Sequence, residues 1–501
     1  MANLFARKPL ARLMEEAEEV GEHSLKRSLG PVNLIALGIG GIIGAGLFVR
    51  TAAAIADRAG PSVVLAFIVA GIGCAFAGLC YAEFASMIPV AGSAYTYSYA
   101  TMGEFVAWII GWDLILEYAV AAATVSDAWS EYANRVLSWF NLALPYRWTH
   151  SPFEHDPGGV YGIMNVPALF ILLILTLLLI KGTKESAFVN GLIVILKVTI
   201  VVLFIGIGWQ FINPANHTPF IPPAMTHTTA QGIVHHYGGL LGILGAAGVV
   251  FFAYIGFDAV STAAQEARNP KRDMPIGILG SLVFCTVLYI LFSYVLSGVA
   301  TVDDFRAAGR EASVAFAISK YMHGYEWLSR AVTVAILAGF SSVILVMLLG
   351  QSRVFFSMSR DGLVPTIFSE VHPRFRTPWK SNMLFFVFTG AMAAFVPADV
   401  TGEMTSIGTL FAFILVCLGV WIMRVRSPEL ERAFRVPAAP VVAILGIITC
   451  GAMIYGLGWT NWLRLIGWLV VGLIVYFTFG KNHSRITAPP PEMPEGITLR
   501  R

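Results

Sequence analysis

Residues 38–46 read Gly-Ile-Gly-Gly-Ile-Ile-Gly-Ala-Gly, inside an apolar run, 32–56, that is long enough to cross a lipid bilayer. Glycines in the middle of such a run weaken a helix and allow backbone amides and carbonyls to face a cavity. Close helix packing through small residues is the alternative, but five glycines in nine residues exceed what one helix crossing needs. A dinucleotide-binding loop is excluded because no strand precedes the glycines. The stretch predicts a transmembrane helix that is broken at membrane depth.

A second break is predicted at residues 252–258, which read Phe-Ala-Tyr-Ile-Gly-Phe-Asp. Twelve apolar runs of membrane length follow one another along the chain: 32–56, 61–88, 102–132, 163–181, 187–212, 238–265, 276–300, 327–358, 381–397, 404–424, 437–457 and 460–480. The two breaks lie five runs apart, and an odd offset inverts the second copy relative to the first. We therefore expect an inverted repeat, 31–212 and 238–425, with a substrate site where the broken helices meet.

The composition indicates a multi-pass membrane protein, because 57% hydrophobic and 13% charged residues would not suit the surface of a soluble domain. The first thirty residues are polar and lack a signal-peptide core. Lys and Arg concentrate at the termini and in the loops on their side, which predicts cytoplasmic termini. The expected order is a cytoplasmic segment 1–30, a ten-helix core 31–425, peripheral helices 437–480 and a cytoplasmic tail 481–501, in a plasma membrane such as a bacterial inner membrane. The five cysteines lie in apolar runs and are interpreted as packing residues.

Lys197 lies alone near the middle of the apolar run 187–212. At ~1.5 Å per residue its ammonium would be ~15 Å from the nearer membrane face. A cation at that depth costs at least ~2.5–3.5 kcal/mol, so such residues usually face a partner or a wet pathway. Snorkelling to the headgroups or a structural ion pair is the alternative. The depth argues against snorkelling and favours a coupling or ion-site role.

Carboxyl and hydroxyl groups inside other runs are further candidates. Asp113 and Glu117 are one helical turn apart, and Asp258 follows the second break. For Asp113 a structural role and a functional role remain equally open, whereas Glu117 and Asp258 flank the expected cavity. Ser341 and Ser342 either line that cavity or bond back to their own helix.

No metal, cofactor or catalytic set is predicted. The histidines lie in loops or tails without the spacing of metal ligands. An enzyme would need a nucleophile and base, or metal ligands, inside the spans. The expected partners are an amino acid substrate, protons and the lipid bilayer, with no nucleic acid; a small partner subunit is left open.

Three motifs carry a resemblance to a known family. Residues 81–95 look like the amino acid permease motif of the amino acid–polyamine–organocation (APC) superfamily. Residues 256–278 and 353–365 resemble the cationic amino acid transporter (CAT) family. The similarity covers nearly the whole chain apart from the first thirty and last twenty residues.

This resemblance implies an all-α membrane fold of the LeuT type, with ten core helices as a 5+5 inverted repeat, helices 1 and 6 broken, and two peripheral helices. It implies that the substrate carboxylate binds backbone groups around Ile42, Ile43, Gly44, Ala45 and Gly46. It implies carbonyl contacts to the α-ammonium from Phe252, Ala253 and Ile255, with Phe252 as an aromatic gate. Lys197 matches the fifth-helix lysine of proton-coupled members, whose ammonium takes a sodium ion's place. Where relatives often have Ser or Thr, this chain has Ala45, which leaves carboxylate binding to the backbone.

Together these features predict a secondary active transporter that imports amino acids by proton symport and accepts cationic ones such as arginine, lysine and ornithine. Glu117 and Asp258 would supply negative potential to a cationic side chain, and Ser341 or Ser342 would leave it room. A neutral amino acid permease for alanine-like substrates, or an amino acid or polyamine exchanger, is the alternative. A membrane receptor or sensor is the alternative from a different class.

Overall fold

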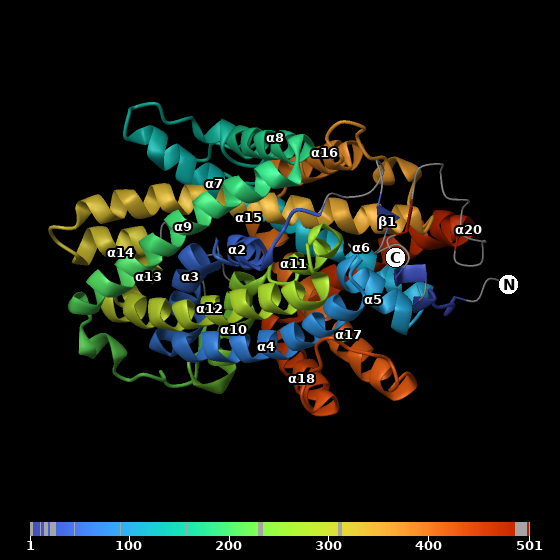
Figure 1. Ribbon diagram of the computed structural model, residues 1–501. Coiled ribbons are helices and arrows are strands. Elements are labelled where there is room, and N and C mark those ends of the chain that lie inside the picture. The colour runs from blue at the N-terminus through green and yellow to red at the C-terminus, as the bar shows by residue number, and fades with distance from the viewer. Residues whose placement is uncertain are drawn as a thin grey trace.

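The computed structural model describes residues 4–10, 12–14, 19–20, 27–44, 46–90, 92–156, 158–228, 234–308, 313–485 and 498–499. Ala45, one of the predicted carboxylate-binding positions, lies outside the described residues. Most of the described chain is helical, and the long helices run side by side in one bundle (Figure 1). This architecture follows from the apolar runs, because only a helix satisfies the backbone groups of a single segment inside a bilayer.

The helices, in chain order, are α2 (Pro31–Ile42), α3 (Thr51–Ala54), α4 (Val63–Met87), α5 (Ser93–Thr101), α6 (Glu104–Ile115), α7 (Ala121–Ser138), α8 (Val166–Lys181), α9 (Thr183–Gly208), α10 (Gly239–Phe251), α11 (Ala259–Thr262), α12 (Pro270–Val299), α13 (Val302–Ala308), α14 (Val314–Tyr321), α15 (Glu326–Arg360), α16 (Trp379–Phe395), α17 (Ala398–Arg426), α18 (Ala439–Leu457), α19 (Trp459–Val475) and α20 (Lys481–His483). Four short strands form two antiparallel pairs: β1 (Glu19–Val20) with β4 (Thr498–Leu499), and β2 (Met225–Thr228) with β3 (Val234–Tyr237).

Nine helical stretches among the described residues are long and apolar enough to cross a membrane. The first of them, Pro31–Met87, covers two of the predicted apolar runs. Each remaining predicted run also contains a helix, although α8 and α16 have only 16 and 17 residues. The chain therefore has the fold of a helical multi-pass membrane protein.

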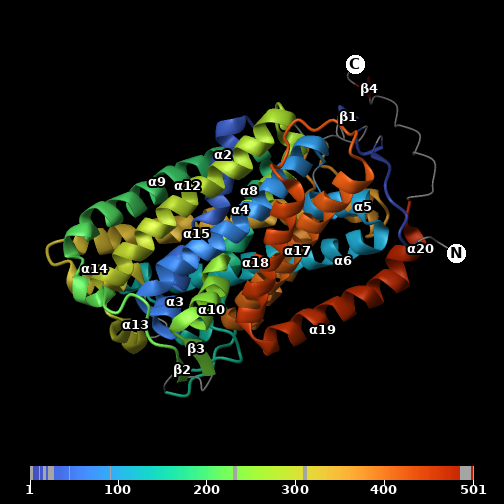
Figure 2. The same cartoon turned by 90° about the horizontal axis from the view of Figure 1, so that it is seen from below.

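The two ends of the bundle carry different elements (Figures 1 and 2). The hairpin end has β2, β3, α13 and α14. The terminal end has α5, α20 and the N-terminal residues 4–10 and 12–14. The hairpin and the helices α5, α13 and α14 are not among the predicted elements, because these short segments lie outside the apolar runs.

Both predicted breaks are present. The helix α2 ends at Ile42, Ile43 is extended (φ −76°, ψ 103°), and a π-helical turn, Gly46–Arg50, resumes the helix. The helix α10 ends at Phe251, and a 3-10 turn, Phe252–Tyr254, follows it before the chain becomes extended at Ile255. Gly256 then has a φ of +119°, a conformation that glycine adopts without the steric cost of a Cβ.

The two breaks pack directly against each other. A Cβ on Gly46 would overlap the backbone of Ala253, and a Cβ on Gly256 would lie 2.7 Å from the carbonyl carbon of Gly41. Tyr289 in α12 then joins the breaks, because its hydroxyl lies 2.8 Å from the Ile42 oxygen and 2.9 Å from the Ala253 oxygen. Glycine is needed here so that the backbones of the two broken segments can touch, as well as for the breaks themselves.

Candidate functional site

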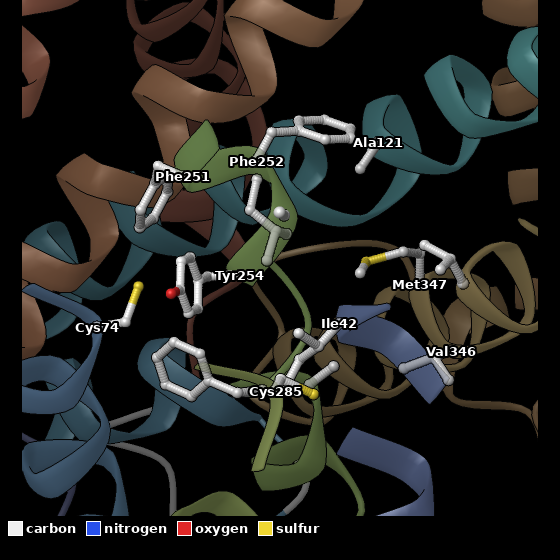
Figure 3. Packing of buried hydrophobic residues seen from close by; sticks show 14 of the residues in the cluster. Ile42, Cys74, Ala121, Phe251, Phe252, Tyr254, Cys285, Val346 and Met347 are labelled. Atoms are coloured by element: carbon white, nitrogen blue, oxygen red, sulfur yellow. The ribbon is translucent and has the colours of Figure 1, made fainter. Parts of the chain in front are cut away.

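A small cavity lies where the breaks meet α7 and the middle of α15. Its lining residues are Gly41, Ile42, Gly44, Gly46, Ala121, Val125, Phe252, Ile255, Val343 and Met347. The volume open to the centre of a water molecule is about 10 Å³, which is room for roughly one water. Figure 3 shows Phe252, Ala121, Ile42 and Met347 around this space, while Phe251 and Tyr254 point to the other side, toward Cys74.

Every side chain that lines the cavity is apolar, so its polar groups come from the backbone of the breaks. At the start of the turn Gly46–Arg50, the N–H groups of Leu47 and Phe48 donate to the Gly44 oxygen at 3.1 and 3.3 Å. The start of a helix in general favours an anion. The carbonyl groups near the second break favour a cation. The arrangement suits a small zwitterion whose side chain is apolar.

The ammonium of Lys197 binds backbone carbonyl groups of the first break. Its ammonium donates to the Gly40 oxygen at 2.7 Å, the Ile43 oxygen at 2.8 Å and the Ser342 Oγ at 2.8 Å. An ammonium has three hydrogens, so all of its donors are used. Ser342 in turn donates to the Gly40 oxygen at 2.8 Å. The fully buried lysine of α9 therefore stabilises the carbonyl groups that the break releases.

The two serines of α15 face different neighbours. Ser342 is buried beside Lys197, behind the break. Ser341 is half-buried; it donates to the Leu337 oxygen at 3.1 Å and accepts from Trp129 Nε1 at 3.0 Å. Neither serine belongs to the cavity lining. Both bond back to their own helix, as the alternative for these serines expects, Ser341 to the Leu337 oxygen and Ser342 to the Gly339 oxygen at 3.0 Å.

The carboxyl groups predicted to attract a cationic side chain also lie outside the lining. Asp258 Oδ2 accepts from the Tyr118 hydroxyl at 2.5 Å, and Asp258 Oδ1 accepts from the Gly256 N–H at 3.3 Å. Asp258 therefore holds the backbone of the second break. Glu117 lies beside Asp258 and is fully buried. Ala253 is directed at Gly46, and its oxygen already accepts from Tyr289.

Phe252 covers the cavity on the side of the hairpin end. Its ring points toward Ala121 in Figure 3, and 7% of the residue is exposed. The guanidinium carbon of Arg50 lies 5.6 Å from the ring centroid, within the range of a cation–π interaction. Arg50 follows the first break and Phe252 begins the second, so the two form one layer over the cavity.

No sequence pattern identifies several residues of the site as functional. Ala121, Val125, Val343 and Met347 resemble any other residues of an apolar helix, and only their place in the bundle brings them to the cavity. Tyr289 lies in an apolar run like many packing tyrosines. No group of three or more His, Cys, Asp or Glu residues with metal-binding geometry occurs in the described ranges.

Replacing Tyr289 with phenylalanine should loosen the contact between the breaks. The hydroxyl has one hydrogen, which the Ile42 and Ala253 oxygens share, so the change removes the equivalent of one buried hydrogen bond. A loss of about 0.5–1.5 kcal/mol is expected. Thermal unfolding in detergent measures it. Tyr455→Phe is the control, because Tyr455 is 74% exposed. Equal melting temperatures for the two variants would contradict the role of Tyr289.

Comparisons with known proteins point to one family. The model of the amino acid permease family matches residues 29–478. The branched-chain amino acid permease BcaP of Bacillus subtilis (strain 168) is 42% identical over 484 residues, which cover 97% of this chain and 99% of that protein. The methylthioribose transporter of the same organism is 39% identical, with 97% and 99% covered. The vacuolar cationic amino acid transporter 4 of Arabidopsis thaliana is 34% identical, with 82% of this chain and 65% of that protein covered.

Proposed function

This chain belongs to the amino acid permease family, and we propose that it imports neutral amino acids with apolar side chains, driven by protons. The observation that carries the proposal is the cavity lining, in which every side chain is apolar. An unpaired cation in such a cavity would lose its hydration without gaining a carboxylate partner. The branched-chain amino acid permease similar to this chain supports the same class.

The substrate would lie between the two breaks. Its carboxylate binds backbone groups near Ile42, Ile43 and Gly44 and the N-terminal end of the turn Gly46–Arg50. Its α-ammonium binds carbonyl groups near Phe252 and Ile255. A substrate side chain then points toward the apolar part of the lining, which consists of Ala121, Val125, Val343 and Met347.

The cavity opens alternately to the two sides of the membrane. Phe252 and Arg50 close it toward the hairpin end, which we assign to the outside. The terminal end then faces the cytoplasm, as the distribution of Lys and Arg favours. This assignment corresponds to twelve spans in a plasma membrane, with a LeuT-type core at 31–425 and helices 437–480 at the periphery. The inverted repeats 31–212 and 238–425 would rock about the site.

Lys197 takes the place of a driving sodium ion in this proposal. Its ammonium already occupies the position where carbonyls of the first break converge on a cation. A fixed cation there makes sodium dispensable and leaves a proton gradient as the driving force. Lys197 takes part in coupling because any movement of the first break alters the contacts of its ammonium.

Cationic amino acids are the second candidate substrate class. The Arabidopsis cationic amino acid transporters support it. Glu117 and Asp258 would then have to face the cavity in another state of the transport cycle. In the present state Asp258 accepts from Tyr118, and neither carboxyl lines the cavity.

Competition for uptake of labelled leucine separates these candidates. In proteoliposomes with an inward proton gradient and no sodium, we expect unlabelled isoleucine and valine to inhibit at concentrations about tenfold lower than arginine or lysine. Ten-fold corresponds to about 1.4 kcal/mol, a modest value beside the cost of burying an unpaired charge. Equal inhibition by arginine would favour the cationic class. Inhibition by methylthioribose but not by amino acids would contradict both.

A further inference from the structure

Three carboxyl groups lie close together inside the bundle: Asp113 in α6, Glu117 in the π-helical turn Leu116–Val120, and Asp258 at the start of α11. All three residues have no exposed surface. We call them the carboxyl cluster. Asp113 and Glu117 are one turn apart and so lie on one face of their helix. The side chain of Glu117 lies next to that of Asp258.

The members of the cluster differ in their partners. Asp258 accepts from the Tyr118 hydroxyl and the Gly256 N–H, so an ionised Asp258 is supported. By contrast, neither oxygen of Asp113 and neither oxygen of Glu117 receives a hydrogen bond from any donor in the described part of the chain. No lysine or arginine forms an ion pair with either group there.

Two unpaired carboxylates at this depth would be very costly. An ionised carboxylate without partners loses its hydration, and a second negative charge next to it adds repulsion. Asp113 and Glu117 therefore hold protons in this state, and Glu117 faces a carboxylate that can share its proton. When water from either side of the membrane reaches the cluster, the free-energy cost of ionising Asp113 and Glu117 falls and their protons can leave.

The cluster is also connected to the substrate cavity. Asp258 accepts from Gly256, and Gly256 packs against Gly41 of the first break. Movement of the second break therefore moves Asp258 relative to Glu117. The π-helical turn around Glu117 is a further point where the helix geometry departs from regular α, as often occurs at functional sites.

We propose that Asp113 and Glu117 bind the proton that is transported with the substrate, with Asp113 as the position nearer the cytoplasm. Along the helix, Asp113 lies between Glu117 and the terminal end at Glu104. A carboxylate gains a proton from outside water, and the same proton leaves to cytoplasmic water, so no other reactant is needed. This inference rests on the proposed proton-driven import, and it places the moving proton on the cluster while Lys197 keeps its charge.

The groups around the cluster are consistent with this role. Among the described residues, the other titratable groups near Glu117 and Asp258 are the hydroxyls of Tyr81, Tyr97 and Tyr118 and the thiol of Cys74. Asp113 lies against Gly408 of α17, where a Cβ would be 3.1 Å from its Oδ1. The ammonium of Lys197 lies on the other side of the first break, bound to Gly40 and Ile43.

Asp113→Asn and Glu117→Gln in proteoliposomes test the inference. We expect wild-type protein to accumulate labelled substrate under an inward proton gradient and to acidify a lumen that contains a trapped pH-sensitive dye. Each variant should lose at least tenfold in both signals while retaining exchange of labelled for unlabelled substrate, which needs no net proton movement. Asp127→Asn is the matched control, because Asp127 is a buried carboxyl on the same continuous helical stretch that lies outside the cluster, and its Oδ1 accepts from Asn165 at 2.9 Å.

The outcomes distinguish this inference from the proposed function. Proton-driven accumulation that survives in Asp113→Asn overturns the role of Asp113 and leaves the importer intact. Sodium-driven accumulation by the wild type overturns the proton-driven function itself. If Asp113→Asn fails to fold, Asp113→Glu keeps a protonatable group and should retain proton-driven uptake; its failure with exchange intact would also count against the inference.

Discussion

Replacing Lys197 with alanine is expected to abolish proton-driven uptake, with a loss of at least about a hundredfold. The variant leaves the Gly40 and Ile43 oxygens without their charged donor. Hydrogen bonds to charged groups contribute about 1.5–3 kcal/mol each, so losing two of them, with a third to Ser342, is enough to disorder the first break. Uptake into proteoliposomes under a proton gradient, with sodium absent, measures the loss.

Lys181→Ala is the control for this experiment, because Lys181 is exposed at the end of α8. It should leave uptake unchanged. Strict dependence of the wild type on sodium would refute the idea that an ammonium replaces a driving ion. Undiminished proton-driven uptake in Lys197→Ala would reduce Lys197 to a structural contact that the bundle can lose.

The second large effect is expected for Gly44→Val, which should abolish substrate binding and leave a folded protein. A Cβ at Gly44 would overlap the side chain of Val343 across the cavity, and the cavity has room for only about one water. A valine would therefore occupy the space in which the substrate carboxylate is expected. Loss of thermal stabilisation by the preferred substrate, and of its binding in a scintillation proximity assay, reports this effect.

Gly191→Val is the matched control, since a Cβ at Gly191 in α9 meets no atom within 4 Å. Its substrate affinity should equal that of the wild type. Unchanged affinity in Gly44→Val would mean that the substrate binds elsewhere. A variant that cannot be purified as a monodisperse protein should be replaced by Gly44→Ala, for which a partial loss of affinity is expected.

The breaks and the depth of Lys197 were accessible from the sequence because each is a local departure from a simple pattern. Glycines inside an apolar run weaken a helix wherever that helix lies in the bundle. A single lysine at bilayer depth needs oxygen partners, and the first break supplies two carbonyl groups.

The composition of the cavity was not accessible in this way. Ser341 and Ser342 are adjacent in sequence, but consecutive helical residues point about 100° apart. As a result Ser342 meets Lys197 of α9 while Ser341 meets Trp129 of α7. The sequence left open whether these serines line the cavity or bond back to their own helix, and neither belongs to the lining of the cavity at the breaks.

The sequence by itself determined that this is a multi-pass membrane protein of the amino acid permease family with two broken helices and a buried lysine. These are properties of composition, motif and local helix continuity. Only the tertiary structure decided which side chains surround the cavity and that Tyr289 joins the breaks. It also decided that Asp258 accepts from the Gly256 backbone, while Asp113 and Glu117 have no donor among the residues that the structure describes. Tyr118 and Asp258 are 140 positions apart, and Tyr289 and Ile42 are 247 apart. Helix packing, which no local pattern encodes, sets the direction of each of these side chains.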